Sequence, residues 1–175
     1  MPAPCYAAWN SATGALTAPP ASQLTNATIN TVRTMLQVAP ASTTSLRIIE
    51  WGYILDATPT APLRVELIDT DAIFASGLTA HVAAGIHKVN VPTGAASTVQ
   101  LGAALTGYNV AGAGTENTIT STRLLDYKTE NGLYYVKQFP LGREPEIAAS
   151  KCLRIRATPT VGAATSIACY VMWEE

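Results

Sequence analysis

The chain has 175 residues, of which 48% are hydrophobic and 13% charged, and its 11 basic and 12 acidic side chains give a formal net charge of −1. The charges are balanced and not clustered, so the sequence shows no basic patch that would bind nucleic acid or an anionic membrane. It also has no run of about 18 apolar residues, the length that a membrane span requires. The length suits one domain, or one domain with an arm, and the first residues lack the basic and apolar segments of a secretory signal.

Residues 1–27 are predicted to form an extended N-terminal arm, and residues 28–175 a β-sandwich domain. Alanine, proline, serine and threonine dominate the first segment, and its large apolar residues are isolated rather than periodic. These residues have no local core to join, so we expect them to anchor the arm in a neighbouring subunit. For the two aromatic ones, folding back on the parent sandwich is the alternative. The anchor candidates are Tyr6, Trp9, Leu16 and Leu24.

Eight segments after the arm have the β-branched, apolar or alternating character of strands, and turns rich in Gly, Pro, Ser and Thr separate them. They cover residues 28–38, 45–55, 63–67, 86–91, 98–101, 123–139, 151–157 and 166–173. Alternation predicts that Arg64 and Glu66, and likewise Arg154 and Arg156, face away from the core. We therefore predict an all-β fold, an antiparallel β-sandwich of jelly-roll type with eight or nine strands.

Two local signals refine this prediction. Asn131-Gly132 lies between two β-prone runs within residues 123–139, and Asn-Gly is the strongest short hairpin signal because both residues accept positive φ. Residues 71–84 have room for a short helical turn, but Gly77 and the β-branched residues argue against a longer helix.

Several of the predicted strands, including residues 45–55, are apolar on both faces. In a two-sheet sandwich this leaves one apolar face that an arm or a second subunit must cover, and we expect a second subunit. The composition agrees, because alanine and threonine make up roughly 30% of the chain and charged residues are scarce. Such a surface costs little to desolvate and repels other copies weakly.

The three cysteines, Cys5, Cys152 and Cys169, do not form a C-x-x-C pair. An odd number without that spacing disfavours both a disulfide framework and a zinc site. Cys152 and Cys169 fall in neighbouring predicted strands, so a bridge between them stays open. Small buried thiols of a protein made in a reducing cytoplasm are the expected state.

No residue pattern in the chain predicts catalysis. His81 and His87 have no close set of further metal ligands, and no G-x-S-x-G elbow marks a nucleophile. A carboxylate pair for glycoside hydrolysis stays open, although solvated strand faces and turns are the expected places for these groups. The carboxylates concerned are Glu50, Glu66, Asp126, Glu144 and Glu146. We therefore expect a protein that is not an enzyme and holds neither a cofactor nor a metal.

Residues 142–146 concentrate charge in a largely neutral chain. Arg143 and Glu144 are interface candidates, because a guanidinium makes bidentate contacts with a carboxylate inside or between subunits. An exposed polar turn is the alternative.

Several runs resemble a small family of structural proteins from tailed bacteriophages of actinobacteria. They are residues 35–38 (MLQV), 47–52 (RIIEWG), 65–68 (VELI), 79–82 (TAHV), 135–144 (YVKQFPLGRE), 152–156 (CLRIR) and 169–173 (CYVMW). The resemblance lies in the pattern and order of these runs, and the segment before residue 28 matches least well. It implies a β-sandwich virion protein, in particular a capsid decoration (cement) protein, and it carries no catalytic residues.

Composition and resemblance lead to one expectation about function. The protein is expected to be made in the host cytoplasm and to bind the capsid exterior of the virion, contacting the major capsid protein as a homotrimer at local three-fold positions. A ligand of the closed lattice stabilises it by mass action, and many weak contacts add avidity. The alternative is a tail or fibre jelly-roll domain that binds host-surface glycans. The aromatic residues for such a groove would be Tyr53, Tyr108, Tyr134 and Tyr135.

Overall fold

The computed structural model describes residues 3–11, 19–110, 114–120, 122–130 and 132–175. Eight strands have five or more residues: β1 (Cys5–Trp9), β3 (Arg33–Val38), β4 (Leu46–Leu55), β5 (Leu63–Thr70), β9 (Thr122–Glu130), β10 (Tyr134–Gln138), β12 (Cys152–Pro159) and β13 (Ser166–Glu174). Five strands have two residues: β2 (Gln23–Leu24), β6 (Thr79–Ala80), β7 (His87–Lys88), β8 (Gly107–Tyr108) and β11 (Glu146–Ile147). The described residues include one 3₁₀ turn, η1 (Ala83–Gly85), and the predicted all-β sandwich is confirmed.

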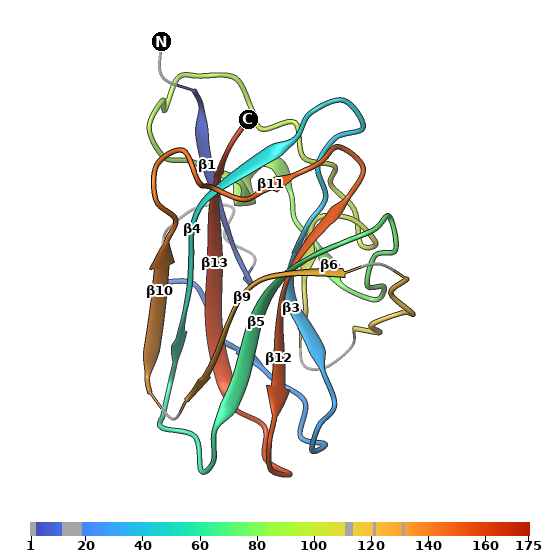
Figure 1. The fold of residues 1–175 in the computed structure, drawn as a ribbon, viewed down its shortest axis with the longest axis vertical. Coiled ribbons are helices and arrows are strands. Elements are labelled where there is room, and N and C mark those ends of the chain that lie inside the picture. The colour runs from blue at the N-terminus through green and yellow to red at the C-terminus, as the bar shows by residue number, and fades with distance from the viewer. Residues whose placement is uncertain (1–2, 12–18, 111–113, 121, 131) are drawn as a thin grey trace.

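The strands form two antiparallel sheets that pack face to face (Figure 1). Sheet A has the order β10-β4-β13-β1-β7, and sheet B has the order β6-β8-β3-β12-β5-β9. The first four long strands pair with the last four in reverse order, as β1–β13, β3–β12, β4–β10 and β5–β9. This nested pairing makes most ladders join segments far apart in the sequence.

The start of the chain differs from the predicted arm. Cys5–Trp9 form β1, which lies inside sheet A between β13 and β7. Tyr6 and Ala8 alternate toward the core and are almost completely buried. The alanine-rich composition hides this two-residue period, and the ladder with β13 supplies the backbone hydrogen bonds that such a short segment needs. Residues 5–9 therefore belong to the sandwich.

The predicted Asn-Gly hairpin is wrong. β9 pairs with β5 in sheet B, whereas β10 pairs with β4 in sheet A. The connection between them therefore crosses from one sheet to the other instead of closing a two-stranded ladder; Asn131 itself lies outside the described residues. A turn signal reports only local backbone preference, and the partners of both strands are set by the nested pairing.

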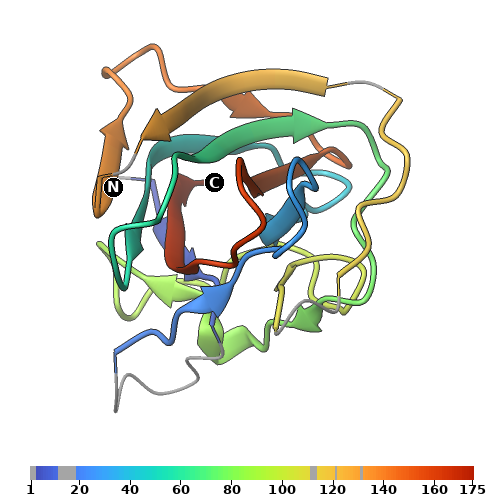
Figure 2. The same cartoon turned by 90° about the horizontal axis from the view of Figure 1, so that it is seen from below.

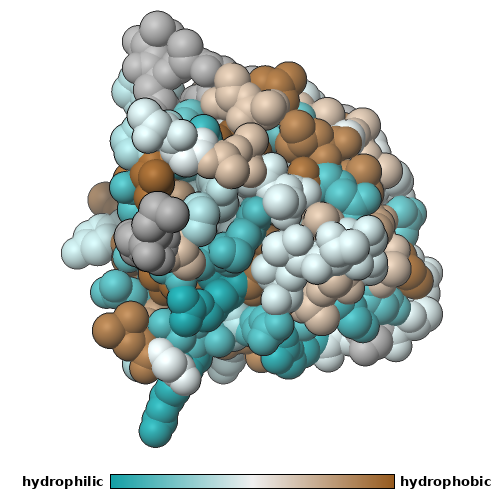
Figure 3. All heavy atoms as spheres, turned by 90° about the horizontal axis from the view of Figure 1, so that it is seen from above, coloured by the Kyte–Doolittle hydropathy of each residue, from teal (hydrophilic) through white to brown (hydrophobic). Residues whose placement is uncertain are grey.

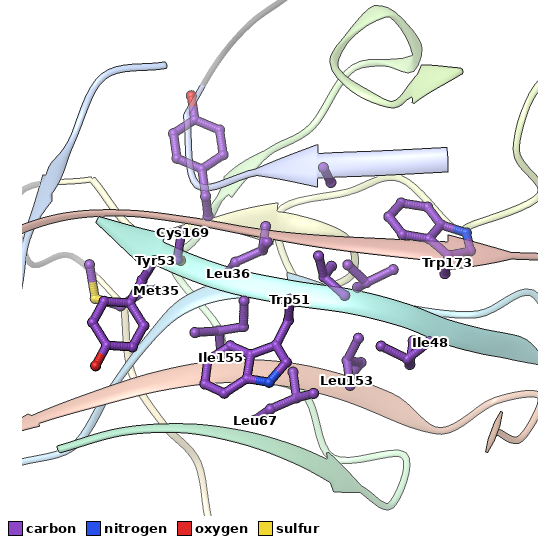
Figure 4. Packing of buried hydrophobic residues seen from close by; sticks show 14 of the residues in the cluster. Met35, Leu36, Ile48, Trp51, Tyr53, Leu67, Leu153, Ile155, Cys169 and Trp173 are labelled. Atoms are coloured by element: carbon purple, nitrogen blue, oxygen red, sulfur yellow. The ribbon is translucent and has the colours of Figure 1, made fainter. Parts of the chain in front are cut away.

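The core lies between the sheets and is built from alternate residues of the long strands (Figure 4). Trp51 and Tyr53 from β4 and Trp173 from β13 supply the largest side chains, and each is almost fully buried. Leu67 from β5 and Ile155 from β12 face them from sheet B. Burying an aliphatic or aromatic side chain contributes about 1.5–3 kcal/mol, so this layer accounts for much of the stabilisation.

Residues 71–121 join β5 to β9 and form the longest connection between two long strands. Within this segment β7 extends sheet A beyond β1, and β8 extends sheet B beyond β3. Figure 2 shows the segment on the side of the sandwich opposite β9 and β10. The segment therefore closes one side of the sandwich and leaves the other side with the strands β9 and β10 at the edges.

The same segment covers the part of the outer face of sheet B that β3 and β12 form. Arg154 in β12 is fully buried and donates hydrogen bonds to the carbonyl oxygens of Ile73 and Glu116. Gln37 in β3 is also buried, and its side-chain oxygen accepts a hydrogen bond from the Ala75 N–H at 2.8 Å. These hydrogen bonds to the covering segment offset much of the cost of burying Arg154 and Gln37.

Glu66 and Arg154 face away from the core, as predicted, but both are buried rather than solvated. Glu66 accepts hydrogen bonds from Arg64 at 2.9 Å and from Arg156. Alternation along a strand identifies the face of the sheet, but it does not show that a distant segment folds over that face. Each buried charge is paired, as the cost of desolvation requires.

Gly52 tests the close packing of sheet A. A Cβ at this position would lie 2.7 Å from the Tyr135 carbonyl oxygen and 2.9 Å from a ring carbon of Tyr170. We expect Gly52→Ala to lower the free energy of unfolding by about 2 kcal/mol, because the clash lies partly with backbone. In Gly162→Ala the nearest contact is 3.7 Å away, and this control should stay within about 0.5 kcal/mol of the parent. Urea unfolding measures both, and equal stabilities would contradict the packing described.

Candidate interaction surface

The outer face of sheet A carries apolar side chains in register across four strands. Trp9 pairs with Tyr170, Tyr170 with Gly52, and Gly52 with Val136, so these residues form one row from β1 to β10. A neighbouring row on the same face consists of Ala168, Ile54 and Tyr134. Paired positions on one face are in contact distance, so the two rows form one surface.

The most exposed part of this surface lies on β4 and β10. The exposed fractions are 72% for Tyr134, 52% for Ile54 and 51% for Val136. Leu141 follows in the turn after β10 and is 93% exposed. Single exposed apolar residues are common, but adjacent ones on a flat sheet face are typical of surfaces that bind another protein.

The middle of the surface is ordered by aromatic packing. The Trp9 ring packs on Tyr170, with 4.6 Å between the ring centroids. The Tyr170 ring crosses Gly52, and its hydroxyl donates a hydrogen bond to Glu50. Burial raises the pKa of the Tyr170 hydroxyl strongly, and the bond to Glu50 raises it further. Tyr170 therefore stays a neutral donor, and its hydroxyl is fixed by the Glu50 carboxylate on the same face.

On the side of the sandwich with β9 and β10, one carboxylate hydrogen-bonds across the two sheets. Asp126 in β9 accepts a hydrogen bond from the Trp51 indole N–H at 3.0 Å and from the Tyr135 hydroxyl at 2.8 Å. Trp51 and Tyr135 belong to sheet A, whereas Asp126 belongs to sheet B. This clasp joins the two sheets where the connection between β9 and β10 crosses.

Removing the clasp should be costly. We expect Asp126→Ala to lower the free energy of unfolding by about 2 kcal/mol, because the buried indole N–H and the Tyr135 hydroxyl lose their acceptor. Asp56→Ala is the matched control, since Asp56 is exposed and its carboxylate accepts a hydrogen bond from the Ser22 hydroxyl, which is exposed as well. Thermal and urea unfolding compare the two variants. Equal losses would show that the carboxylate does not join the sheets.

The predicted anchors fall in different places. Tyr6 is in the core beside Trp173, and its hydroxyl donates to the Ala95 carbonyl oxygen, which corresponds to the alternative of folding back. Trp9 is partly buried on the outer face of sheet A. Leu24 is 48% exposed in β2, at the start of β13. Leu16 lies outside the described residues.

The charged candidates are in the turn that follows β10. Arg143 is exposed and its N–H donates to the Pro140 carbonyl oxygen, while Glu144 is partly buried. No ion pair of the two side chains is found among the described residues. The turn adjoins the exposed Leu141, so it extends the apolar surface with a polar margin.

The groups with possible chemistry do not converge. In the described part of the chain, no group of three or more His, Cys, Asp and Glu side chains is placed to hold a metal ion. Cys5, Cys152 and Cys169 are free and buried, and burial raises the pKa of Cys152 to about 11. The end of the sandwich near both termini has a hollow of about 260 Å³. Its lining residues are Ala3, Ser45, Arg47, Glu146, Glu174 and Glu175.

Figure 3 looks onto this end and shows hydrophilic side chains gathered together with hydrophobic ones around them. Arg47 forms an ion pair with Glu174. Glu175 accepts hydrogen bonds from the Thr98 N–H at 2.7 Å and from the Trp173 indole at 3.0 Å. These carboxylates therefore have structural partners, and their arrangement secures the C-terminal end.

His81 belongs to the segment 71–121 and is buried beside Trp9 at the end of β1. Its ring packs on Tyr108 at 5.0 Å, and its Nε2 has no hydrogen-bond partner among the described residues. Burial lowers the pKa of His81 from 6.5 to about 4. A backbone hydrogen bond with Trp9 acts in the opposite direction and raises this pKa, and the nearby His87 lowers it slightly. The neutral ring is therefore the form that fits the folded protein.

This burial predicts a pH dependence. Above pH 6.5 His81 is neutral in both states; as the pH falls toward 4, only the unfolded chain gains the proton, so stability is lost across this window. The loss should reach roughly 3 kcal/mol relative to His81→Gln, which cannot titrate. His87→Gln removes only the smallest of the three influences on His81, so this control should keep most of the parent pH dependence. Urea unfolding between pH 7 and pH 4 measures this, and parallel curves for the parent and His81→Gln would contradict it.

Sequence reasoning did not identify Ile54 and Val136 as surface residues. Two signals for this surface were present in the sequence. Strands that are apolar on both faces predicted an uncovered face, and residues 134–138 alternate between exposed and half-buried positions. The mistaken hairpin placed β10 beside β9, which hid the fact that Tyr134 and Ile54 are neighbours.

Comparison with known proteins adds no relative: no family model, no curated protein and no solved structure matches the chain. The described residues contain no helix with the length and apolar character that crossing a membrane requires. The candidate surface is therefore interpreted from its own chemistry.

Proposed function

We propose that the chain is a virion structural protein, a capsid decoration (cement) protein that binds the outside of a tailed-phage head. The observation that carries the proposal is the apolar outer face of sheet A, with Ile54, Tyr134 and Val136 about half or more exposed. A flat apolar face on a chain with 13% charged residues favours binding to another protein surface, since few charges lose water on contact.

The mechanism is linkage between binding and lattice stability. A protein that binds only the closed lattice of the major capsid protein lowers the free energy of that lattice by mass action. Each copy needs only a modest contact, because many copies act together on one shell. Three copies around each local three-fold position would match the symmetry of the shell.

We also infer that the sandwich is a jelly roll. The eight long strands pair as nested antiparallel couples, from β1 with β13 to β5 with β9, and successive couples belong to alternate sheets. Double-sheet folds of eight strands occur in viral capsid and lectin domains. This is an analogy of fold, and it supports the proposal together with the resemblance of residues 35–173 to phage structural proteins.

The alternative, a tail or fibre domain that binds glycans, relied on four tyrosines. Tyr53 and Tyr108 are almost fully buried, and Tyr135 is half-buried beside Trp51. Tyr134 alone of the four is exposed. A glycan groove built from these side chains is therefore not favoured by their positions.

Binding to heads tests the proposal. The purified chain should bind phage heads prepared without it, and a double variant Ile54→Asp, Tyr134→Asp should bind at least ten-fold more weakly, because charge is then buried at the contact. The control is Val82→Asp, Val161→Asp, which makes the same charge change at exposed valines elsewhere and should bind like the parent.

Copy number provides the second readout. Quantitative mass spectrometry of purified virions should find hundreds of copies for a cement protein, whereas a few to a few dozen copies would indicate a tail component. Absence of binding to heads, or unchanged binding of the Ile54 and Tyr134 variant, would overturn the proposal.

A further inference from the structure

β10 is an edge strand whose outer backbone groups have no strand beside them in the described part of the chain. The Leu55 N–H donates to Leu133, and the Phe139 N–H donates to Ile49, so the odd-numbered residues of this stretch point their backbone groups at β4. In an antiparallel ladder the intervening residues point the other way. The N–H and C=O groups of Tyr134, Val136 and Gln138 therefore face outward along the edge.

We propose that β10 pairs with β10 of a second copy of this chain, antiparallel and centred on Val136. In this register Val136 lies opposite Val136 of the second copy, and Tyr134 lies opposite Gln138. All three residues use their outward groups, so the pair forms six backbone hydrogen bonds. An exposed apolar edge strand is a template for such pairing, and a two-fold contact requires only that the strand complement itself.

Charge selects this register. A ladder centred on Lys137 would place two lysines directly opposite each other, which is destabilising. A ladder centred on Tyr135 pairs only Tyr134 and Val136 within the strand and leaves Gln138 opposite Gly132, outside β10. Centring on Val136 pairs the whole strand and sets Lys137 opposite Tyr135, where an ammonium and an aromatic ring are compatible.

The pairing also continues the apolar surface. The row Trp9, Tyr170, Gly52, Val136 meets the same row of the second copy at the two-fold axis, so one extended sheet carries both outer faces. The contact uses backbone along the edge and leaves the faces uncovered. A two-fold contact is distinct from the proposed three-fold one, so on a shell it would join neighbouring trimers.

The neighbouring edge strand is less suited to this role. β9 carries Arg123, which pairs with Asp69, and Lys128, which lies over the Tyr135 ring. These charged side chains surround the β9 edge, whereas β10 carries Lys137 as its one charge. The contact is small beside a standard interface of about 1,600 Å², so we expect it to be weak in dilute solution and to need a covalent trap.

Disulfide trapping tests the proposal on the purified chain alone, so its outcome does not depend on binding to heads. Opposed residues of a hydrogen-bonded pair lie about 5.5 Å apart between Cα atoms, which suits a disulfide. Under mild oxidation Val136→Cys should form a cross-linked dimer at least ten-fold faster than Val82→Cys, a control of similar exposure away from β10. The natural cysteines are buried in both variants.

A mixing experiment tests the register. Tyr134→Cys and Gln138→Cys, oxidised together, should give the mixed dimer in clear excess over either homodimer, because only the mixed pair brings the two thiols into opposition. Cross-linking of Val136→Cys no faster than the control, or a statistical mixture of the Tyr134→Cys and Gln138→Cys products, would overturn the proposal.

Discussion

The structure depends on the way one chain closes a sandwich by nested pairing. The first four long strands pair with the last four in reverse, and this arrangement leaves β9 and β10 as neighbouring edges on one side. Asp126 adds a polar link between the sheets there, because it accepts hydrogen bonds from Trp51 and Tyr135. On the opposite side, residues 71–121 add β7 and β8 to the sheets, so only the clasped side presents long edge strands among the described residues.

The two outer faces of the sandwich are used differently. On the outer face of sheet B, residues 71–121 lie over β3 and β12, where Arg154 finds partners at Ile73 and Glu116, while Leu124 and Tyr127 of β9 stay about half exposed. The outer face of sheet A carries Ile54, Tyr134 and Val136 in exposed positions, next to a polar row that contains Glu50 and Gln138. Adjacent exposed apolar residues on one sheet face are typical of a protein that binds another surface. This distribution is the physical basis for proposing that the protein works in an assembly.

Much of the fold was predictable from local patterns, and the errors have physical causes. Strands β4, β5, β12 and β13 were predicted close to their observed bounds, because alternation or two-sided apolarity is strong in them. β1 was missed because small alanines conceal which side chains face inward, although Tyr6 does. The hairpin was wrong because a local turn preference says nothing about partners more than 50 residues away. Two-sided apolar strands did predict an uncovered face, but only the ladder register shows that Ile54 and Tyr134 share it.

Hydrogen exchange at β10 tests the central claim most directly, since it follows the edge itself through assembly. The amides of Tyr134, Val136 and Gln138 should exchange quickly in the dilute protein and at least ten-fold more slowly in the assembled particle. Amides of β5, inside sheet B, should exchange equally slowly in both states. If the three β10 amides exchange as fast in the particle as in dilute solution, this edge is not an assembly interface, and the pairing of β10 between copies is contradicted.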